Sequence, residues 1–250
     1  MERGVYSAAS GMLAQQSLQE VLAQNVANAT TVGYKQDKMT FRAAQNMALL
    51  RLTGASSRGV SIGEMGTGVQ KDQTYIDWQS GPITTTNNPL DVSLASGQFL
   101  AAQVGTRTLY TRAGNLQIDA NANLVTASGR NILDTQSRPI NVAGRLNITI
   151  DERGNVLANK QPIAQIQIVQ ADTALLEKEG DTFYRSTSAT PVPAAQNPRL
   201  RIGTLEQSNA NVMEGLVHLI TVSRSFEMAQ KALTTQDELL RQATTELGKV

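Results

Sequence analysis

The chain of 250 residues contains no cysteine, one histidine and few aromatic side chains. The lack of cysteine excludes disulfide bonds, thiolate catalysis and cysteine-ligated metal. Phe, Trp and Tyr make up 4% of the residues, which leaves little material for stacking nucleic-acid bases or a planar cofactor. His218 has no second histidine or grouped ligands beside it. We therefore expect it to face solvent or an interface, and predict neither a metal site nor a Ser-His-Asp arrangement.

An excess of charge and long apolar runs are also missing. Lys+Arg number 22 and Asp+Glu 21, with no basic cluster, so electrostatic capture of nucleic acid is not predicted. No apolar run approaches the ~20 residues of a membrane span, and the N-terminus lacks the apolar segment of a cleavable secretory signal. We expect a chain without a membrane span that either stays in the cytoplasm or is exported without a cleaved signal peptide.

One acidic segment has the spacing that begins an EF-hand calcium loop. Asp119, Asn121 and Asn123 alternate with apolar residues. Leu124 stands where the loop glycine belongs and Arg130 where the bidentate glutamate belongs, so the segment is predicted to be a polar hairpin turn. The sequence thus predicts no metal ion.

Glycines and carboxylates do not form a catalytic or cofactor pattern either. Gly63, Gly66 and Gly68 cluster, but they precede a region of β periodicity instead of opening a helix. The adjacent acids Asp151 and Glu152 lie in a predicted turn. We therefore predict a protein that is not an enzyme and binds no cofactor.

The C-terminal residues 211–250 carry a sustained seven-residue repeat of apolar side chains. Its first column is Val212, Leu219, Phe226, Leu233, Leu240 and Leu247. Asn211 can cap the start of a helix and Gly248 can end it. At ~1.5 Å per residue such a helix is about 55 Å long, and its apolar seam requires partner helices.

A first helix is predicted over about residues 3–28. Its apolar residues recur mainly at helical steps and comprise Val5, Ala8, Met12, Leu18, Leu22 and Val26. We expect this helix and the C-terminal helix to pack in a coiled-coil-like layer. The helix runs into a loop with Asn25, Asn28, Gly33 and Tyr34, which is either a recognition motif or an elaborate helix stop.

Between the helices the period changes to two, which predicts many short strands with frequent turns. The expected fold class is α+β, with the two long helices and a central all-β domain that is barrel- or sandwich-like. The predicted divisions are 1–34 (helix and loop), 35–69 (extended arm), 70–203 (β domain) and 204–250 (helix). Within the arm, residues 41–52 have a pattern that also suits a short helix.

Three blocks of sequence carry motifs that recur together, and in this order, in one known family. The N-terminal block is Tyr6-Ser-Ala-Ala-Ser-Gly11-Met12, followed by Asn25-Val-Ala-Asn28-Ala-Thr-Thr-Val-Gly33-Tyr34-Lys35. The central block contains Gly66-Thr-Gly68-Val69, Asn88-Pro89-Leu90-Asp91-Val92, Tyr110-Thr-Arg112-Ala-Gly114-Asn115 and Leu124-Val-Thr126. The C-terminal block is Leu205-Glu206-Gln-Ser208-Asn209 with Arg224-Ser-Phe226-Glu227. Through these blocks the sequence resembles the flagellar hook–basal-body rod family.

The resemblance implies a structural subunit of the bacterial flagellar basal-body rod, located in the periplasmic space. It implies helical assembly through the terminal helices, which transmits torque, and export by the flagellar type III apparatus without a cleaved signal. The implied partners are copies of the chain, other rod and hook axial proteins and that export apparatus. Length and residues 223–228 favour a proximal-rod (FlgF-like) type, whereas the long arm favours a distal-rod (FlgG-like) type.

The expected assembly interface combines the helical seam with the loop after the first helix. It comprises Val5, Met12, Leu22, Asn25, Asn28, Gly33, Tyr34, Val212, Leu219, Phe226, Leu233, Leu240 and Leu247. Two other classes of function stay open on the residues alone. One is a coiled-coil adaptor of fixed stoichiometry, and the other is a carbohydrate-active enzyme on a β scaffold.

Overall fold

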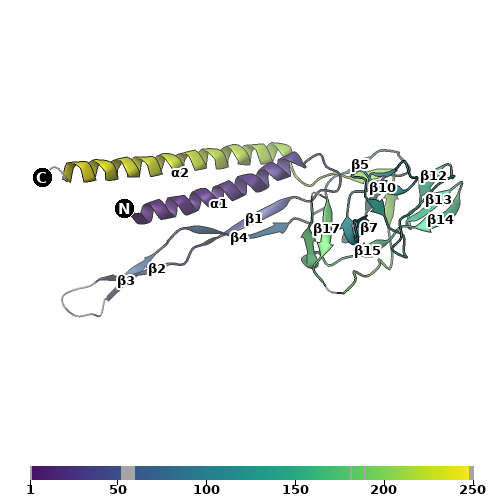
Figure 1. The fold of residues 1–250 in the computed structure, drawn as a ribbon, viewed down its shortest axis with the longest axis horizontal. Coiled ribbons are helices and arrows are strands. Elements are labelled where there is room, and N and C mark those ends of the chain that lie inside the picture. Colours follow the sequence, from purple (N-terminus) through teal and green to yellow (C-terminus); the bar gives the residue numbers. More distant parts are fainter. Residues whose placement is uncertain (1, 52–59, 181, 189, 248–250) are drawn as a thin grey trace. The chain divides into compact units, whose positions relative to one another are not determined.

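The computed structural model describes residues 2–51, 60–180, 182–188 and 190–247 (Figure 1). The chain forms two compact units, each built from segments that are distant in sequence. The helical unit is drawn from Met1–Val26, Asp37–Tyr75 and Val212–Val250. The β unit is drawn from Ala27–Gln36 and Ile76–Asn211. The fold is therefore mixed, with an N-terminal helix, a C-terminal helix and many strands between them, as the periodicity predicted.

In its described residues, the helical unit contains two long helices and four strands. Its elements are α1 (Glu2–Ala27), β1 (Asp37–Ala43), β2 (Met47–Arg51), β3 (Val60–Met65), β4 (Val69–Ile76) and α2 (Val212–Leu247). Figure 1 draws α1 and α2 side by side. The start of α2 agrees with the predicted cap residue Asn211, whereas the predicted stop residue Gly248 lies outside the described residues. The bounds of α1 differ from the prediction by about one residue.

Two close contacts define how α1 and α2 lie against each other. A Cβ atom on Gly4 would lie 3.4 Å from the side-chain amide of Gln236, and one on Gly215 would lie 2.5 Å from Val26 Cγ2. Gly4, near the start of α1, lies against the second half of α2, and Val26, near the end of α1, lies against the start of α2. The two helices therefore run antiparallel, and the two contacts are almost equally far apart along both of them. With equal rise per residue, this register sets Leu22 opposite the α2 seam.

The arm between α1 and the β unit is a two-stranded ribbon. Among the residues that the structure describes, β1 pairs with β4, and β2 pairs antiparallel with β3. The alternative short helix, expected over residues 41–52, is wrong for residues 41–51, and residue 52 lies outside the described residues. Backbone groups there find partners across the ribbon, where Ala44 N–H donates to Gly68 O at 2.9 Å and Thr67 Oγ1 donates to Gln45 O at 2.7 Å.

The described residues of the β unit form short strands and one 3-10 turn. They are β5 (Ile83–Thr85), β6 (Val92–Leu94), β7 (Gln98–Val104), β8 (Arg107–Thr111), β9 (Leu116–Ile118), β10 (Leu124–Thr126), β11 (Asn131–Ile132), β12 (Ile148–Ile150), β13 (Asn155–Ala158), β14 (Gln161–Gln165), β15 (Ile168–Gln170), η1 (Thr173–Leu175), β16 (Leu176–Lys178), β17 (Phe183–Ser186), β18 (Leu200–Ile202) and β19 (Thr204–Glu206). The expected hairpin turn at Asp119 is present, since its carboxylate accepts from the N–H groups of Asn121 and Asn123 between β9 and β10.

The largest sheet has eight strands in the order β16-β17-β8-β7-β11-β10-β9, with β15 also on β7. Among the described residues its two end strands do not pair with each other, so the sheet is open. The barrel form of the prediction is therefore wrong. Strand β7 is central because alternate residues face two cores: Leu100 and Ala102 lie in the main cluster, and Phe99 packs with Tyr184 in the second.

Candidate functional site

The loop after α1 enters the β unit through a tight glycine turn. Gly33 has φ +71°, and a Cβ there would lie 2.5 Å from the backbone carbon of Arg112. Its N–H donates to the backbone oxygen of Glu206 at 2.8 Å. The next residue, Tyr34, is fully buried. A left-handed backbone at a site with no room for a side chain requires glycine, so this motif positions the chain by close backbone approach.

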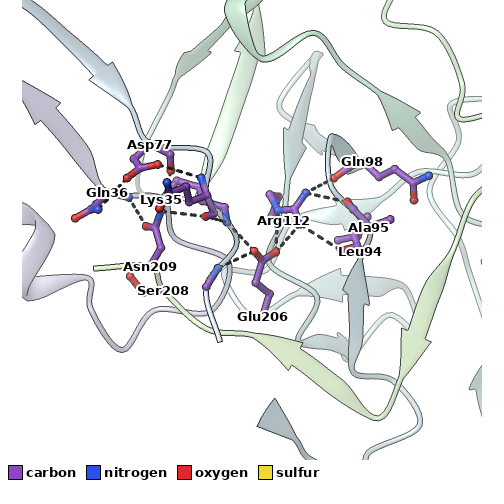
Figure 2. A network of polar contacts seen from close by, with 12 residues as sticks. Lys35, Gln36, Asp77, Leu94, Ala95, Gln98, Arg112, Glu206, Ser208 and Asn209 are labelled. Carbon is purple, nitrogen blue, oxygen red and sulfur yellow. Dashed lines mark hydrogen bonds and ion pairs between the residues drawn. The ribbon is translucent and has the colours of Figure 1, made fainter. Parts of the chain in front are cut away.

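Glu206 lies at the end of β19 and is the centre of a buried ion cluster, which we define as Lys35, Arg112 and Glu206 (Figure 2). One carboxylate oxygen accepts from Lys35 Nζ at 2.6 Å and from Gly81 N–H at 3.2 Å. The other accepts from Arg112 Nε at 2.8 Å and from Nη2 at 2.6 Å. A carboxylate offers about four acceptor positions, and all of them are occupied here.

Arg112 supplies the second half of the ion cluster from the end of β8. Besides its two bonds to Glu206, Nη1 donates to the carbonyls of Ala95 (3.2 Å) and Gln98 (2.9 Å). Nη2 also donates to the carbonyl of Leu94 at 3.3 Å. All five N–H groups of the guanidinium are thereby bonded, three of them to the bend between β6 and β7. A lysine has only three donors and could not replace it.

Lys35 joins the ion cluster from the loop after α1. Its Nζ donates to the carbonyl of Gln79 at 2.8 Å in addition to Glu206, and its side chain is fully buried. The backbone oxygen of Lys35 in turn accepts from Lys178 Nζ at 2.8 Å. That ammonium also lies 4.1 Å from the ring centroid of Tyr34, a cation–π contact. The loop is therefore attached to β16 as well as to β19.

Asn209 adds a second connection just before α2. Its Oδ1 accepts from Gln36 N–H at 2.8 Å, and its Nδ2 donates to the carbonyls of Asp77 (2.8 Å) and Gln79 (3.1 Å). In Figure 2, Asn209 lies beside Gln36 and Asp77, and Glu206 lies toward Arg112. The segment that leads to α2 and the segment that follows α1 are thus bonded to each other within the β unit.

The charges of the ion cluster depend on one another. Burial acts to raise the pKa of Glu206, but the charge of Arg112 and the hydrogen bond and charge of Lys35 outweigh it and lower that pKa below its usual value. Burial lowers the pKa of Lys35, and the hydrogen bond and charge of Glu206 only partly oppose this. Two cations thus surround one ionised carboxylate, and removal of that carboxylate would leave both cations buried without a counter-charge.

Such a saturated cluster is suited to holding backbone segments in place. Its groups have no spare hydrogen-bonding position for a substrate at Glu206 or Arg112, and in the described part of the chain no group of three or more His, Cys, Asp and Glu side chains could hold a metal ion. The candidate site is therefore structural: it fixes both segments that connect the β unit to the helices.

The residues expected at the assembly interface fall into two sets. In the helical unit, Val5, Met12 and Leu22 of α1 and Leu219, Phe226, Leu233 and Leu240 of α2 are half-buried, whereas Val212 is 37% exposed. The side chain of Leu247 lies outside the described residues. Gly33 and Tyr34 belong to the β unit instead, where they pack beside the ion cluster. Their part in contacts between subunits stays a prediction.

Asn25 and Asn28 have local roles in the structure. Asn25 is buried, and its side chain both accepts from Asp37 N–H (2.9 Å) and donates to Asp37 O (2.8 Å), which ties the last turn of α1 to the start of β1. Asn28 Oδ1 accepts from Thr31 Oγ1 at 3.1 Å and so shapes the loop. His218 is exposed, as expected.

Sequence reasoning did not single out Lys35, Arg112 and Glu206 as one site. Each of them occurs in one of the three resembling blocks, but 171 residues separate Lys35 from Glu206. The available signal was the position of isolated charges inside otherwise small or apolar motifs, such as Gly33-Tyr34-Lys35. That signal indicates a buried charge without revealing its partner.

Comparison with known sequences gives three family matches in chain order. Residues 5–35 match the flagella basal body rod protein family, 96–158 the flagellar hook protein FlgE/F/G D1 domain, and 201–246 the flagellar basal body rod FlgEFG protein C-terminal family. Each of these ranges contains or adjoins one member of the ion cluster.

Whole-chain relatives agree with these matches. The chain is 31% identical to the flagellar hook-basal body complex protein FlhO of Bacillus subtilis over 100% of both chains. It is 32% identical to the flagellar basal-body rod protein FlgG of the same organism, over 97% of this chain and 98% of the relative. It is 28% identical to the basal-body rod protein FlgF of Caulobacter vibrioides over 100% of both.

Fold, ion cluster and matched segments together define a structural protein of the bacterial flagellum. The chain belongs to the flagellar basal-body rod protein family, which is a family of structural subunits and not of enzymes. Relatives named FlgF and FlgG match 100% and 97% of this chain.

Proposed function

We propose that this subunit of the flagellar rod assembles helically through α1 and α2 and transmits torque through those contacts. The observation that carries the proposal is an exposed apolar surface at the start of α2. We call it the α2 outer patch, and it consists of Met213, Leu216, Val217 and Ile220. Met213 and Val217 are 74% and 61% exposed, although both lie on a helix whose apolar column is half-buried from Leu219 to Leu240.

An exposed patch of this kind favours contact with another protein surface. Burial of a Val, Leu, Ile or Met side chain contributes about 1.5–3 kcal/mol, and the gain is repeated at every subunit of a helical assembly. The four side chains of the α2 outer patch occupy barely two turns of helix, so a neighbouring helix can cover all of them at once. A contact of fixed register between stiff helices is what torque transmission requires.

The half-buried seam supports a layered arrangement within each subunit. In this proposal α1 and α2 form a coiled-coil-like pair along the Leu219, Phe226 and Leu233 column, and the α2 outer patch faces a neighbour. The remaining expected interface residues act at the edges of this layer. The functional divisions that we propose remain 1–34, 35–69, 70–203 and 204–250, with the outer domain of the subunit formed by the third.

Location and partners follow from family membership. Rod proteins assemble with other axial proteins of the flagellum, so we propose copies of this chain and neighbouring rod or hook proteins as partners. We further propose that the flagellar type III apparatus exports the chain to the periplasmic rod without cleavage of a signal peptide. No helix among the described residues combines the length and apolarity needed to cross a membrane.

A substitution in the α2 outer patch tests the proposal. Ile220→Asp places a charge where a neighbour would bury an apolar side chain, and we expect complete rods and swimming to be lost in cells that depend on this variant. Thr234→Asp is the matched control, because Thr234 is also β-branched, exposed and two heptads along the same helix. Electron microscopy of purified basal bodies and a swimming assay provide the measurement.

The folding of both variants is checked by the fluorescence of Trp78 and by circular dichroism. Normal rods and swimming with Ile220→Asp would contradict assembly through the α2 outer patch. Equal loss with Thr234→Asp would show that any added charge on α2 is harmful, which would also contradict the role of the patch.

A further inference from the structure

A polar cavity of about 810 Å³ lies on the β unit, and none of the residues that line it belongs to the ion cluster. Three arginines line it: Arg153, Arg199 and Arg201. Arg199 and Arg201 flank the buried Leu200 at β18, and alternation along a strand sets both arginine side chains on the same side. Leu200 N–H donates to the backbone oxygen of Glu152 at 3.0 Å, which holds the turn that carries Arg153 beside β18.

The cavity has an excess of positive charge. Among the residues that the structure describes, none of the three guanidiniums forms an ion pair within 4.0 Å. Two carboxylates lie in the same region. Glu152 lines the cavity. Asp151 is already occupied, since it accepts from the N–H groups of Arg153 and Asn155 and from the Asn155 side chain. Its hydrogen bonds leave the charge of Asp151 in place, so the three cations exceed the two carboxylates by one positive charge.

We propose that this cavity binds an acidic segment of another protein, with two carboxylates held by the arginines. A planar guanidinium matches a carboxylate with two parallel hydrogen bonds, so three of them can hold two carboxylates in a defined spacing. The lining also includes the amides of Gln165 and Asn197, which can both donate to and accept from a peptide backbone.

The composition of the lining distinguishes an acidic peptide from other anions. The described residues that line the cavity include no aromatic side chain, so sugar rings and nucleic-acid bases lack a surface on which to stack. The cavity is also much larger than a single oxyanion, which suits an extended peptide. This site does not depend on the proposed assembly through the helices, because the β unit alone forms it.

The test uses the full chain and a fluorescein-labelled peptide, Glu-Gly-Glu-Gly-Glu, with Gln-Gly-Gln-Gly-Gln as the uncharged counterpart. We expect fluorescence anisotropy to detect binding of the acidic peptide that weakens as NaCl rises from 50 to 300 mM. The double variant Arg199→Gln/Arg201→Gln should bind about tenfold more weakly. Arg130→Gln/Arg145→Gln removes the same charge from exposed positions outside the cavity and should remain within about twofold of the original chain.

Several results would overturn the proposal: no binding of the acidic peptide, equal binding of both peptides, or equal loss in the two double variants. A sulfated oligosaccharide or an anionic phospholipid vesicle that binds more tightly, with the same dependence on Arg199 and Arg201, would assign the cavity to another ligand class. If the double variant shifts the fluorescence of Trp78, the single change Arg153→Gln in the exposed turn replaces it, with an expected loss of about threefold. An unchanged affinity in a folded Arg153→Gln chain would refute the site.

Discussion

Glu206→Gln removes one charge from the centre of the ion cluster while almost preserving the shape of the side chain. The glutamine keeps one oxygen and replaces the other with an NH2 group that can only donate. That group would face donors on either side, because one carboxylate oxygen accepts from Lys35 and Gly81 and the other accepts twice from Arg112. Whichever way the amide turns, two hydrogen bonds are lost and two cations remain buried.

The loss of stability expected for Glu206→Gln follows from the burial of the ion cluster. The side chains of Lys35, Arg112 and Glu206 are at most 3% exposed, so water cannot replace the lost carboxylate. Removal of one partner from a buried ion pair costs about 3–5 kcal/mol. Because a typical domain unfolds at a cost of about 5–15 kcal/mol, we expect Glu206→Gln to remove a large fraction of the stability of the β unit.

Urea unfolding followed by the single tryptophan is the assay. Trp78 packs against Phe99 at 5.5 Å and Tyr184 at 4.8 Å between ring centroids, so its fluorescence reports on the β unit. The control is Glu177→Gln, which makes the same chemical change in an exposed pair: Glu177 Oε2 lies 2.7 Å from Arg185 Nη2, but its side chain is 59% exposed. Glu177→Gln should lower the free energy of unfolding by less than about 1 kcal/mol.

A clear outcome would refute this reasoning. If Glu206→Gln and Glu177→Gln lower the free energy of unfolding by similar amounts, below about 1 kcal/mol, the ion cluster does not hold the two connecting segments. A large loss confined to Glu206→Gln, with an unchanged helical signal in circular dichroism, would agree with a role in the β unit.

Two further predictions concern the same region. Gly33→Ala should lower the free energy of unfolding in urea by at least about 2 kcal/mol, because its Cβ would meet the Arg112 backbone at 2.5 Å. Gly105 also has a positive φ but has open space around it, so Gly105→Ala should lower that free energy by about 1 kcal/mol. Equal losses in the two variants would contradict the close approach at Gly33. Because Arg112 and Lys35 lower the pKa of Glu206, the stability from this carboxylate is fully present above the ordinary carboxyl pKa and is lost as pH falls through the lowered value. The free energy of unfolding, measured from pH 7 to pH 2, should therefore fall more steeply in the original chain than in Glu206→Gln. Parallel curves for the two chains would contradict the lowered pKa of Glu206.

Much of the local structure could be predicted from periodicity and capping residues. The repeat that runs through Leu219 and Phe226 predicts a helix capped by Asn211, and α2 begins at Val212. The alternation around residues 146–150 and the Asp119 turn predicted strands and a hairpin at their observed places. These signals are short in range, since they depend on neighbours within a helical turn or a strand pair.

Other features depended on partners far along the chain. Residues 41–51 suit a helix or a strand locally, and only the pairing with residues 60–76 makes them a ribbon. Whether the β unit closes into a barrel depends on how its edge strands meet, which no local pattern specifies. For the same reason an open sheet could not be distinguished from a barrel in advance.

The two long helices, the β character of the middle and the family of the chain could be inferred before the structure, because they follow from periodicity and from motifs of neighbouring residues. Only the tertiary structure decided that Lys35, Arg112 and Glu206 share one buried site. Burial makes each of these charges unfavourable alone, so their positions have meaning only together, and the contact between them spans 171 residues of chain. The same folding leaves the α2 outer patch exposed, which the repeat alone could not show.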